Sequence, residues 1–171
     1  MNPESPVRRH SLGATENQAT ACPVPSAART LLDPEAFDYS DAFALRVPAG
    51  DQRSAEAWAR AMFTPSGPLL KSFAAAWGVV TGVKAPTTGR RIASFRLTTP
   101  ELGAAVLEGD GPRYHIYLVV LLGQGRLTFA TFAKSRSVIW RVALKAIMVA
   151  HRRVALRLME RALVLQPTTD D

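Results

Sequence analysis

The chain has 171 residues, of which 47% are hydrophobic and 20% charged, with a formal net charge of +7. This length and composition fit one globular domain with a sizeable core and exclude a wholly disordered chain. The sequence has a single cysteine, Cys22, no zinc-type Cys/His spacing and no apolar run long enough to span a membrane. These features indicate a cytoplasmic protein without metal or organic cofactor.

Residues 1–30 are rich in Pro, Ser, Thr and Ala and have no apolar periodicity. They predict a disordered or loosely attached leader, followed by a single domain over 31–166 and a tail over 167–171. Within the domain, Ala36–Val47 mixes aromatic and aliphatic residues with polar ones and ends at a Pro-Ala-Gly-Asp turn. This pattern predicts a first strand.

Two short helices are expected next. Ser54 is a favourable N-cap for a helix that ends before Pro65. A second helix is predicted from Ser66–Pro68 to Gly78, with a loop over 81–90. The aromatic residues of both helices are expected to pack in the core or to close the mouth of a cavity; they are Trp58, Phe63, Phe73 and Trp77.

Four strands follow, at Ile92–Thr99, Gly103–Glu108, Arg113–Leu122 and Arg126–Arg136. The glycine-rich turns between the later strands imply antiparallel neighbours. The last strand alternates, with Leu127, Phe129 and Thr131 on one face. The strand before it is apolar on both faces, so we expect one face to meet the core and the other a second layer or a partner, which permits a homodimer.

Val138–Leu165 predicts an amphipathic helix about 42 Å long. Its basic side chains form two stripes, and residues 134–161 carry eight Lys and Arg residues against Glu160 alone. These stripes form either a solvated face or a surface for nucleic acid or anionic lipid, although no base-reading motif supports nucleic acid. The apolar stripe contains Trp140, Leu144, Ile147, Val154, Leu158 and Ala162.

This order of elements predicts an α+β fold in which a curved antiparallel sheet wraps around the long C-terminal helix, with two short helices after the first strand. The order is similar to the helix-grip plan of the START and Bet v 1-like superfamily. That resemblance implies a cavity between the sheet and the helix.

A closer resemblance is carried by three stretches: the Asp38–Phe43 strand with the helix after it, Arg113–Tyr117 with the next strand, and His151–Met159. They are similar to the bacterial "domain of unknown function 2867" family and together span about residues 36–165. That family usually has a proline shortly before the final-helix histidine, where this chain has Val149-Ala150, so we expect a straighter helix. The resemblance implies a fold and a cavity but no reaction.

His151 lies within the apolar stripe and therefore faces the sheet or the cavity. A buried imidazole there is either an acid/base or ligand-binding group or a core histidine with a satisfied hydrogen bond. His115 and Tyr117 share one face of a strand, which lines the cavity unless the alternate residues face inward. Asp38 and Asp41 are three residues apart; two carboxylates can do acid/base work if their environments separate their pKa values, but on a strand these two face opposite sides, so we expect them to cap or to stabilise a turn.

Three functional hypotheses follow. The first is a carrier for an apolar lipid, polyketide or isoprenoid, and the second is a cofactor-independent cyclase or isomerase of secondary metabolism with His151 as acid/base, assisted by Tyr117 and His115. The third is a basic interaction module for nucleic acid or a membrane surface. Nucleotide-binding, serine hydrolase and zincin motifs are absent. The predicted ligand-binding residues are Trp58, Phe73, Trp77, Arg96, Phe129, Thr131, Trp140 and Ile147.

Overall fold

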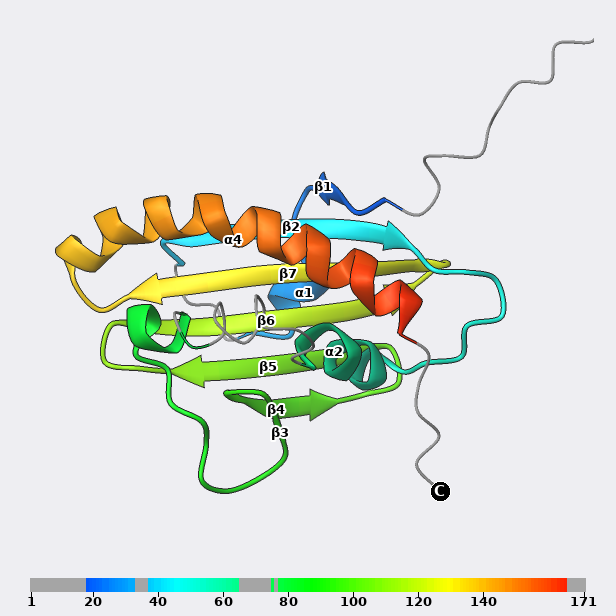
Figure 1. Cartoon of the computed structure of the whole chain (residues 1–171), viewed down its shortest axis with the longest axis horizontal. Helices are drawn as coiled ribbons and strands as arrows, with labels where there is room; N and C mark the ends of the chain where they lie inside the picture. The colour runs from blue at the N-terminus through cyan, green and yellow to red at the C-terminus, as the bar shows by residue number, and fades with distance from the viewer. Residues whose placement is uncertain (1–17, 33–36, 65–74, 76, 166–171) are drawn as a thin grey trace, which may run out of the picture.

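The computed structural model describes residues 18–32, 37–64, 75 and 77–165 (Figure 1). These residues form a curved antiparallel sheet of seven strands in the order β1-β2-β7-β6-β5-β4-β3. The long C-terminal helix α4 lies across one face of this sheet (Figure 1). The predicted α+β fold, with a curved antiparallel sheet and a long C-terminal helix, is therefore confirmed.

The elements differ in length from a few residues to more than twenty. In chain order they are β1 (Thr20–Cys22), α1 (Ser26–Thr30), β2 (Tyr39–Arg46), α2 (Ala55–Phe63), β3 (Arg91–Ile92), β4 (Phe95–Pro100), β5 (Ala104–Asp110), β6 (Tyr114–Gly123), β7 (Arg126–Ser135) and α4 (Val138–Val164). Residues 77–81 are also helical.

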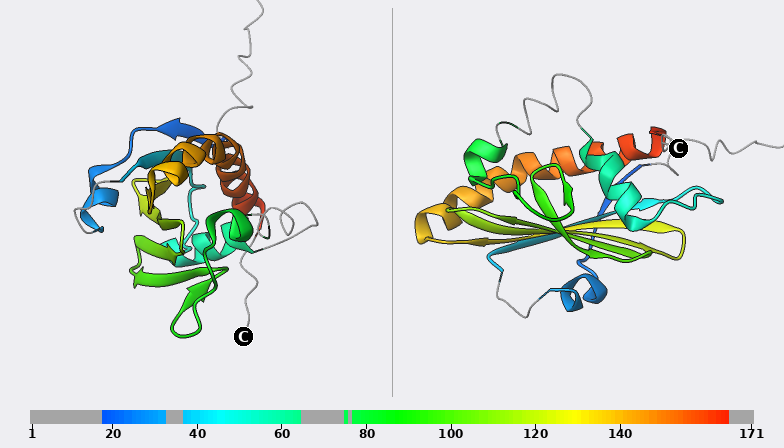
Figure 2. Two further views of the ribbon diagram at one scale, coloured as in Figure 1. Left: turned by 90° about the vertical axis from the view of Figure 1, so that its left-hand side faces the viewer. Right: turned by 90° about the horizontal axis from the view of Figure 1, so that it is seen from below.

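The two faces of the sheet are both covered, because strand residues alternate between them. On the inner face, Phe43 and Phe129 belong to the same buried core as Met148 of α4. On the outer face, Phe132 of β7 belongs to a second core with Ala28 of α1. Figure 2 shows α4 and α1 on opposite sides of the sheet.

The predicted loose leader is wrong for residues 20–30. β1 pairs antiparallel with β2, where Ala21 faces Phe43 across the two strands, and α1 covers the outer face. A three-residue strand and a five-residue helix carry too little periodicity to be recognised locally, and tertiary contacts stabilise them here. They supply the second layer that the apolar β6 strand requires; residues 1–17 lie outside the described residues.

Two further boundaries differ from the sequence prediction. The single strand expected at Ile92–Thr99 is two strands, β3 and β4, which pair through a tight turn with Ala93 at φ 51°. The helix expected to end at Gly78 continues to residue 81. It ends at Gly82, which has φ 72° and donates its N–H to the carbonyl of Gly78 at 2.8 Å. The predicted start of that helix lies outside the described residues.

The pairing of β2 with β7 places the first long strand beside the last one in the sheet. The register runs from Tyr39 opposite Ala133 to Arg46 opposite Arg126. Within it, Asp41 and Thr131 are direct partners. Two polar residues that are 90 positions apart in the sequence thus lie side by side under α4.

Candidate functional site

His151 lies on the buried side of α4, as its position in the apolar stripe predicts. It is 6% exposed. Its Nε2 shares a 2.9 Å hydrogen bond with the Thr131 hydroxyl. The ring centroids of Trp77 and Phe129 lie 5.5 and 6.3 Å from the centroid of the imidazole. An apolar and aromatic wall therefore surrounds one polar ring.

Asp41 is the second buried titratable group of this site, and it is 8% exposed. Its Oδ1 lies 4.0 Å from Nε2 of His151. Its Oδ2 accepts a 2.5 Å hydrogen bond from the Tyr39 hydroxyl and lies 3.7 Å from Nε of Arg152. Arg152 Nε also donates to the Tyr39 hydroxyl at 3.1 Å. These groups form a polar chain from the exposed Arg152 inward to His151 and Thr131.

The protonation states of His151 and Tyr39 follow mainly from burial. Burial lowers the pKa of His151, and this effect outweighs the nearby Asp41 carboxylate, which raises it. The imidazole is therefore neutral at pH 7. Burial and, next, the hydrogen bond to Asp41 raise the pKa of Tyr39 to about 12. Tyr39 therefore keeps its proton and acts as a donor to Asp41.

One atom of the site lacks a hydrogen bond. Asp41 Oδ1 is fully buried, and no described residue donates a hydrogen bond to it. The 4.0 Å separation from His151 is too long for such a bond. A buried acceptor without a donor costs roughly 1–3 kcal/mol, so it is an unusual feature that favours a role in binding or chemistry. This oxygen can accept a donor group from a ligand.

His115 and Tyr117 do not join this site, because they lie on the outer face of β6. Tyr114 and Ile116, which alternate with them, face the inner core instead. His115 Nε2 lies 3.0 Å from Oε1 of Glu108, and its ring centroid lies 4.6 Å from that of Tyr117. The prediction that both residues assist His151 is therefore wrong, and the alternative with inward-facing neighbours is the one observed.

Only some of the predicted ligand-binding residues lie at this site. Thr131, Phe129 and Trp77 contact His151, as the preceding distances show. Arg96 is on the outer face of the sheet, where it forms an ion pair with Glu108. Phe73 lies outside the described residues.

Three remaining predicted residues are packing residues of α2 and α4. Trp58 is fully buried, with the Arg53 guanidinium carbon 3.5 Å from its ring centroid. Trp140 packs against Tyr114, whose hydroxyl donates to the Trp140 carbonyl at 3.0 Å. Ile147 is half-buried against the inner core. These positions support the helix rather than contact His151.

Asp41 is the site residue to which sequence reasoning gave the wrong preferred role. The sequence predicts a capping or turn role for it, but it lies buried inside β2. Asp38 comes closer to that prediction, because its Oδ2 accepts from the backbone N–H and the hydroxyl of Ser135 at the end of β7. The one useful signal was the position of Asp41 within a predicted strand. The strand that pairs with it is distant in sequence, so no local pattern links Asp41 to Thr131.

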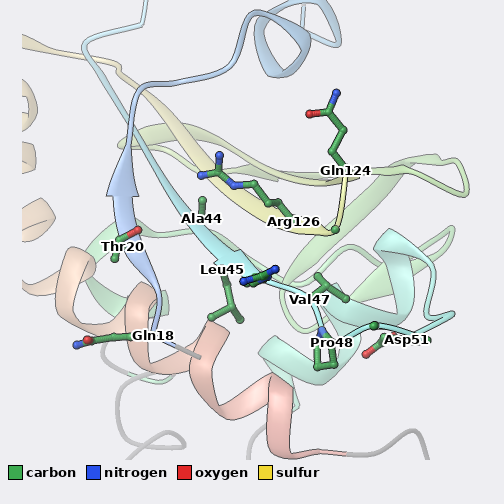
Figure 3. A pocket seen from close by; sticks show the side chains of 13 residues that line it. Gln18, Thr20, Ala44, Leu45, Val47, Pro48, Asp51, Gln124 and Arg126 are labelled. Carbon is green, nitrogen blue, oxygen red and sulfur yellow. The ribbon is translucent and has the colours of Figure 1, made fainter. Parts of the chain in front are cut away.

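A separate open pocket of about 1040 Å³ lies at the end of the sheet (Figure 3). Figure 3 shows side chains of β1, β2, the loop after β2 and the β6–β7 turn around it, among them Thr20, Asp51, Gln124 and Arg126. No described residue of the predicted site lines it. The pocket is wide, and none of the residues that line it is a buried titratable group with an unsatisfied hydrogen bond. His151 and Asp41 therefore form the better candidate site.

Among the described residues, no three His, Cys, Asp or Glu side chains converge to hold a metal ion. In the same part of the chain, no helix has the length and apolar character needed to cross a membrane. Comparisons with protein-family profiles, curated proteins and solved structures found no match. The resemblance to the domain of unknown function 2867 family therefore stays a prediction.

Proposed function

We propose that the protein binds an apolar small molecule between its sheet and α4, and that the molecule carries one hydrogen-bond donor, such as a hydroxyl group. The observation that supports this proposal is the buried Asp41 Oδ1, which no described residue satisfies, beside the neutral ring of His151. A few polar groups within an apolar wall are typical of small-molecule sites. Lipids, polyketides and isoprenoid alcohols have this chemistry.

Access to Asp41 and His151 would involve Trp77. This residue is half-buried, and its ring packs against the imidazole at an interplanar angle of 32°. Because His151 is only 6% exposed, a ligand would displace the Trp77 ring and take its place against the aromatic wall. Trp77 is then both the cover of the site and a fluorescent reporter of its occupation.

The test is native mass spectrometry of the purified protein, followed by extraction and mass analysis of any released molecule. The decisive variant is Asp41→Asn. Because Tyr39 donates to the Oδ2 position, the carbonyl of the new asparagine is expected there, which places the amide nitrogen, a donor, at the Oδ1 position. We expect the wild type to retain a bound molecule and this variant to lose it.

Arg96→Gln provides the matched control, since it also removes a charge but lies on the outer face of the sheet. It should retain the molecule as the wild type does. Equal retention by Asp41→Asn, or a wild type that carries and binds nothing apolar, would contradict the proposed site.

A second candidate function is acid/base catalysis on the same molecule, as in a cofactor-independent cyclase or isomerase. The 4.0 Å separation of His151 Nε2 from Asp41 favours it, because a carboxylate stabilises the imidazolium that forms when histidine takes up a proton. His151→Gln should then abolish turnover while sparing binding. Turnover at the wild-type rate in that variant would leave the carrier function alone.

The proposal also retains three expectations from the sequence: a cytoplasmic location, membership of the domain of unknown function 2867 family and the possibility of self-association. It needs no second copy, because α1 covers the apolar outer face of β6. Light scattering of the purified chain would measure the oligomeric state directly.

A further inference from the structure

The side of α4 that faces away from the sheet carries an apolar stripe. Val138, Val142 and Val149 are 70%, 68% and 62% exposed. At 100° per residue these three positions fall within an arc of about 40° on the helix. Ile139, near the same end, is 77% exposed. Three valines so exposed along one line are unusual for a helix whose opposite side is already buried in the core.

Basic residues flank this stripe on both sides. Arg141, Lys145 and Arg152 lie along one edge and Arg153 and Arg157 along the other, by the same helical geometry. All five are exposed.

Not all of these cations are already paired within the protein. Arg141 forms an ion pair with Asp38 at 2.8 Å, and Arg152 contacts Tyr39. Within the described part of the chain, no ion pair involves Lys145, Arg153 or Arg157. Three positive charges beside the valine stripe therefore remain free to meet an external negative charge.

We propose that this face of α4 docks on the surface of an anionic lipid bilayer. A helix that lies in a membrane interface buries an apolar stripe among the acyl chains and directs flanking Lys and Arg side chains to lipid phosphates. The exposed face of α4 has this arrangement of valines and cations. Figure 2 shows the helix along one side of the molecule, with its far side not covered by another described element.

The composition of the face argues against two other occupants. A second copy of the same helix would bring the basic edges of both copies together, and like charges repel. A nucleic acid would satisfy the cations but would place phosphates over the valines, with no aromatic side chain on the stripe to stack on bases. A bilayer surface satisfies both the apolar stripe and its charged edges.

The experiment is co-sedimentation of the full chain with vesicles of phosphatidylcholine alone and with vesicles that contain phosphatidylglycerol. We expect binding to the anionic vesicles only, and weaker binding at high salt. A first variant, Val142→Ser with Val149→Ser, removes two of the three valines of the stripe and keeps every charge. A second variant changes Lys145, Arg153 and Arg157 to Gln; each lost charge should weaken binding about fivefold.

Matched controls lie elsewhere on the surface. Val79→Ser with Leu102→Ser removes two exposed apolar side chains, 75% and 87% exposed, and leaves α4 intact. Changing Lys84, Arg91 and Arg126 to Gln removes three exposed charges away from α4. Both controls should sediment as the wild type does.

Three results would overturn the proposal. One is the absence of binding to anionic vesicles. Another is undiminished binding by the valine variant, which would indicate a general polyanion surface such as one for nucleic acid. The third is a wild type that self-associates through α4 without vesicles, so that the valine variant becomes monomeric.

Discussion

A buried neutral histidine makes the stability of the protein depend on pH in a specific direction. His151 has a lowered pKa in the folded state, because burial disfavours its charged form. In the unfolded chain its pKa returns to about 6.5. Below that pH the unfolded state binds a proton that the folded state does not, so stability is fully present above pH 6.5 and falls as the pH decreases.

The magnitude follows from proton linkage. Between pH 7 and pH 5.5, a histidine with an unfolded pKa of about 6.5 contributes a loss of at most about 1.2 kcal/mol, the limit reached when the buried imidazole takes up no proton in the folded state. The other titratable groups of the protein add their own pH dependence, and a variant that changes position 151 alone retains those groups. The difference between the two proteins therefore isolates the imidazole.

The assay is urea denaturation of the wild type and of His151→Gln at both pH values. We expect the wild type to lose up to about 1.2 kcal/mol more than the variant, although the variant is less stable at pH 7. Thr131→Val removes the hydrogen bond to His151 but keeps the imidazole, so it should retain the wild-type pH dependence. Parallel losses in the wild type and His151→Gln would refute a buried neutral imidazole.

Two other predictions test the packing that positions the site. Gly111→Ala should destabilise the fold by roughly 1–3 kcal/mol, because its Cβ would lie 2.9 Å from the backbone of Gly82; Gly123→Ala, which meets open space, should change stability by less than about 0.5 kcal/mol. Arg53→Ala should cost about 3 kcal/mol, since it removes the cation–π contact with Trp58 and two hydrogen bonds to carbonyls at the end of α4. Thermal or urea denaturation measures both effects. The glycine contact would be contradicted by a Gly111 variant as stable as the Gly123 variant. The Arg53 contacts would be contradicted by an Arg53 variant within about 1 kcal/mol of the wild type.

Local sequence patterns predict which side of a long helix or strand is buried. The buried stripe of α4, which includes Leu144 and Leu158, is long enough to place His151 on the side that faces the sheet. The alternation of β7 places Phe129 and Thr131 on the inner face of the sheet. In both cases the period of the pattern equals the period of the element, so the buried face follows from the residues alone.

The rest depends on contacts between distant segments. Asp41 belongs to the site because β2 pairs with β7, a pairing that no local pattern of β2 specifies. The orientation of His115 depends on which side of the doubly apolar β6 faces α4, and α1 covers the other side. A strand that is apolar on both faces does not distinguish them by periodicity, so this choice required the three-dimensional structure.

The most direct test of the proposed site is an NMR titration of the His151 imidazole with farnesol and with farnesene, an isoprenoid hydrocarbon that lacks the hydroxyl group. Farnesol should shift the His151 signal in a saturable manner and bind about tenfold more tightly, or better, because its hydroxyl can donate to the Asp41 carboxylate. An unchanged His151 signal with both molecules, or equal affinity for the alcohol and the hydrocarbon, would contradict a ligand site built on Asp41 and His151.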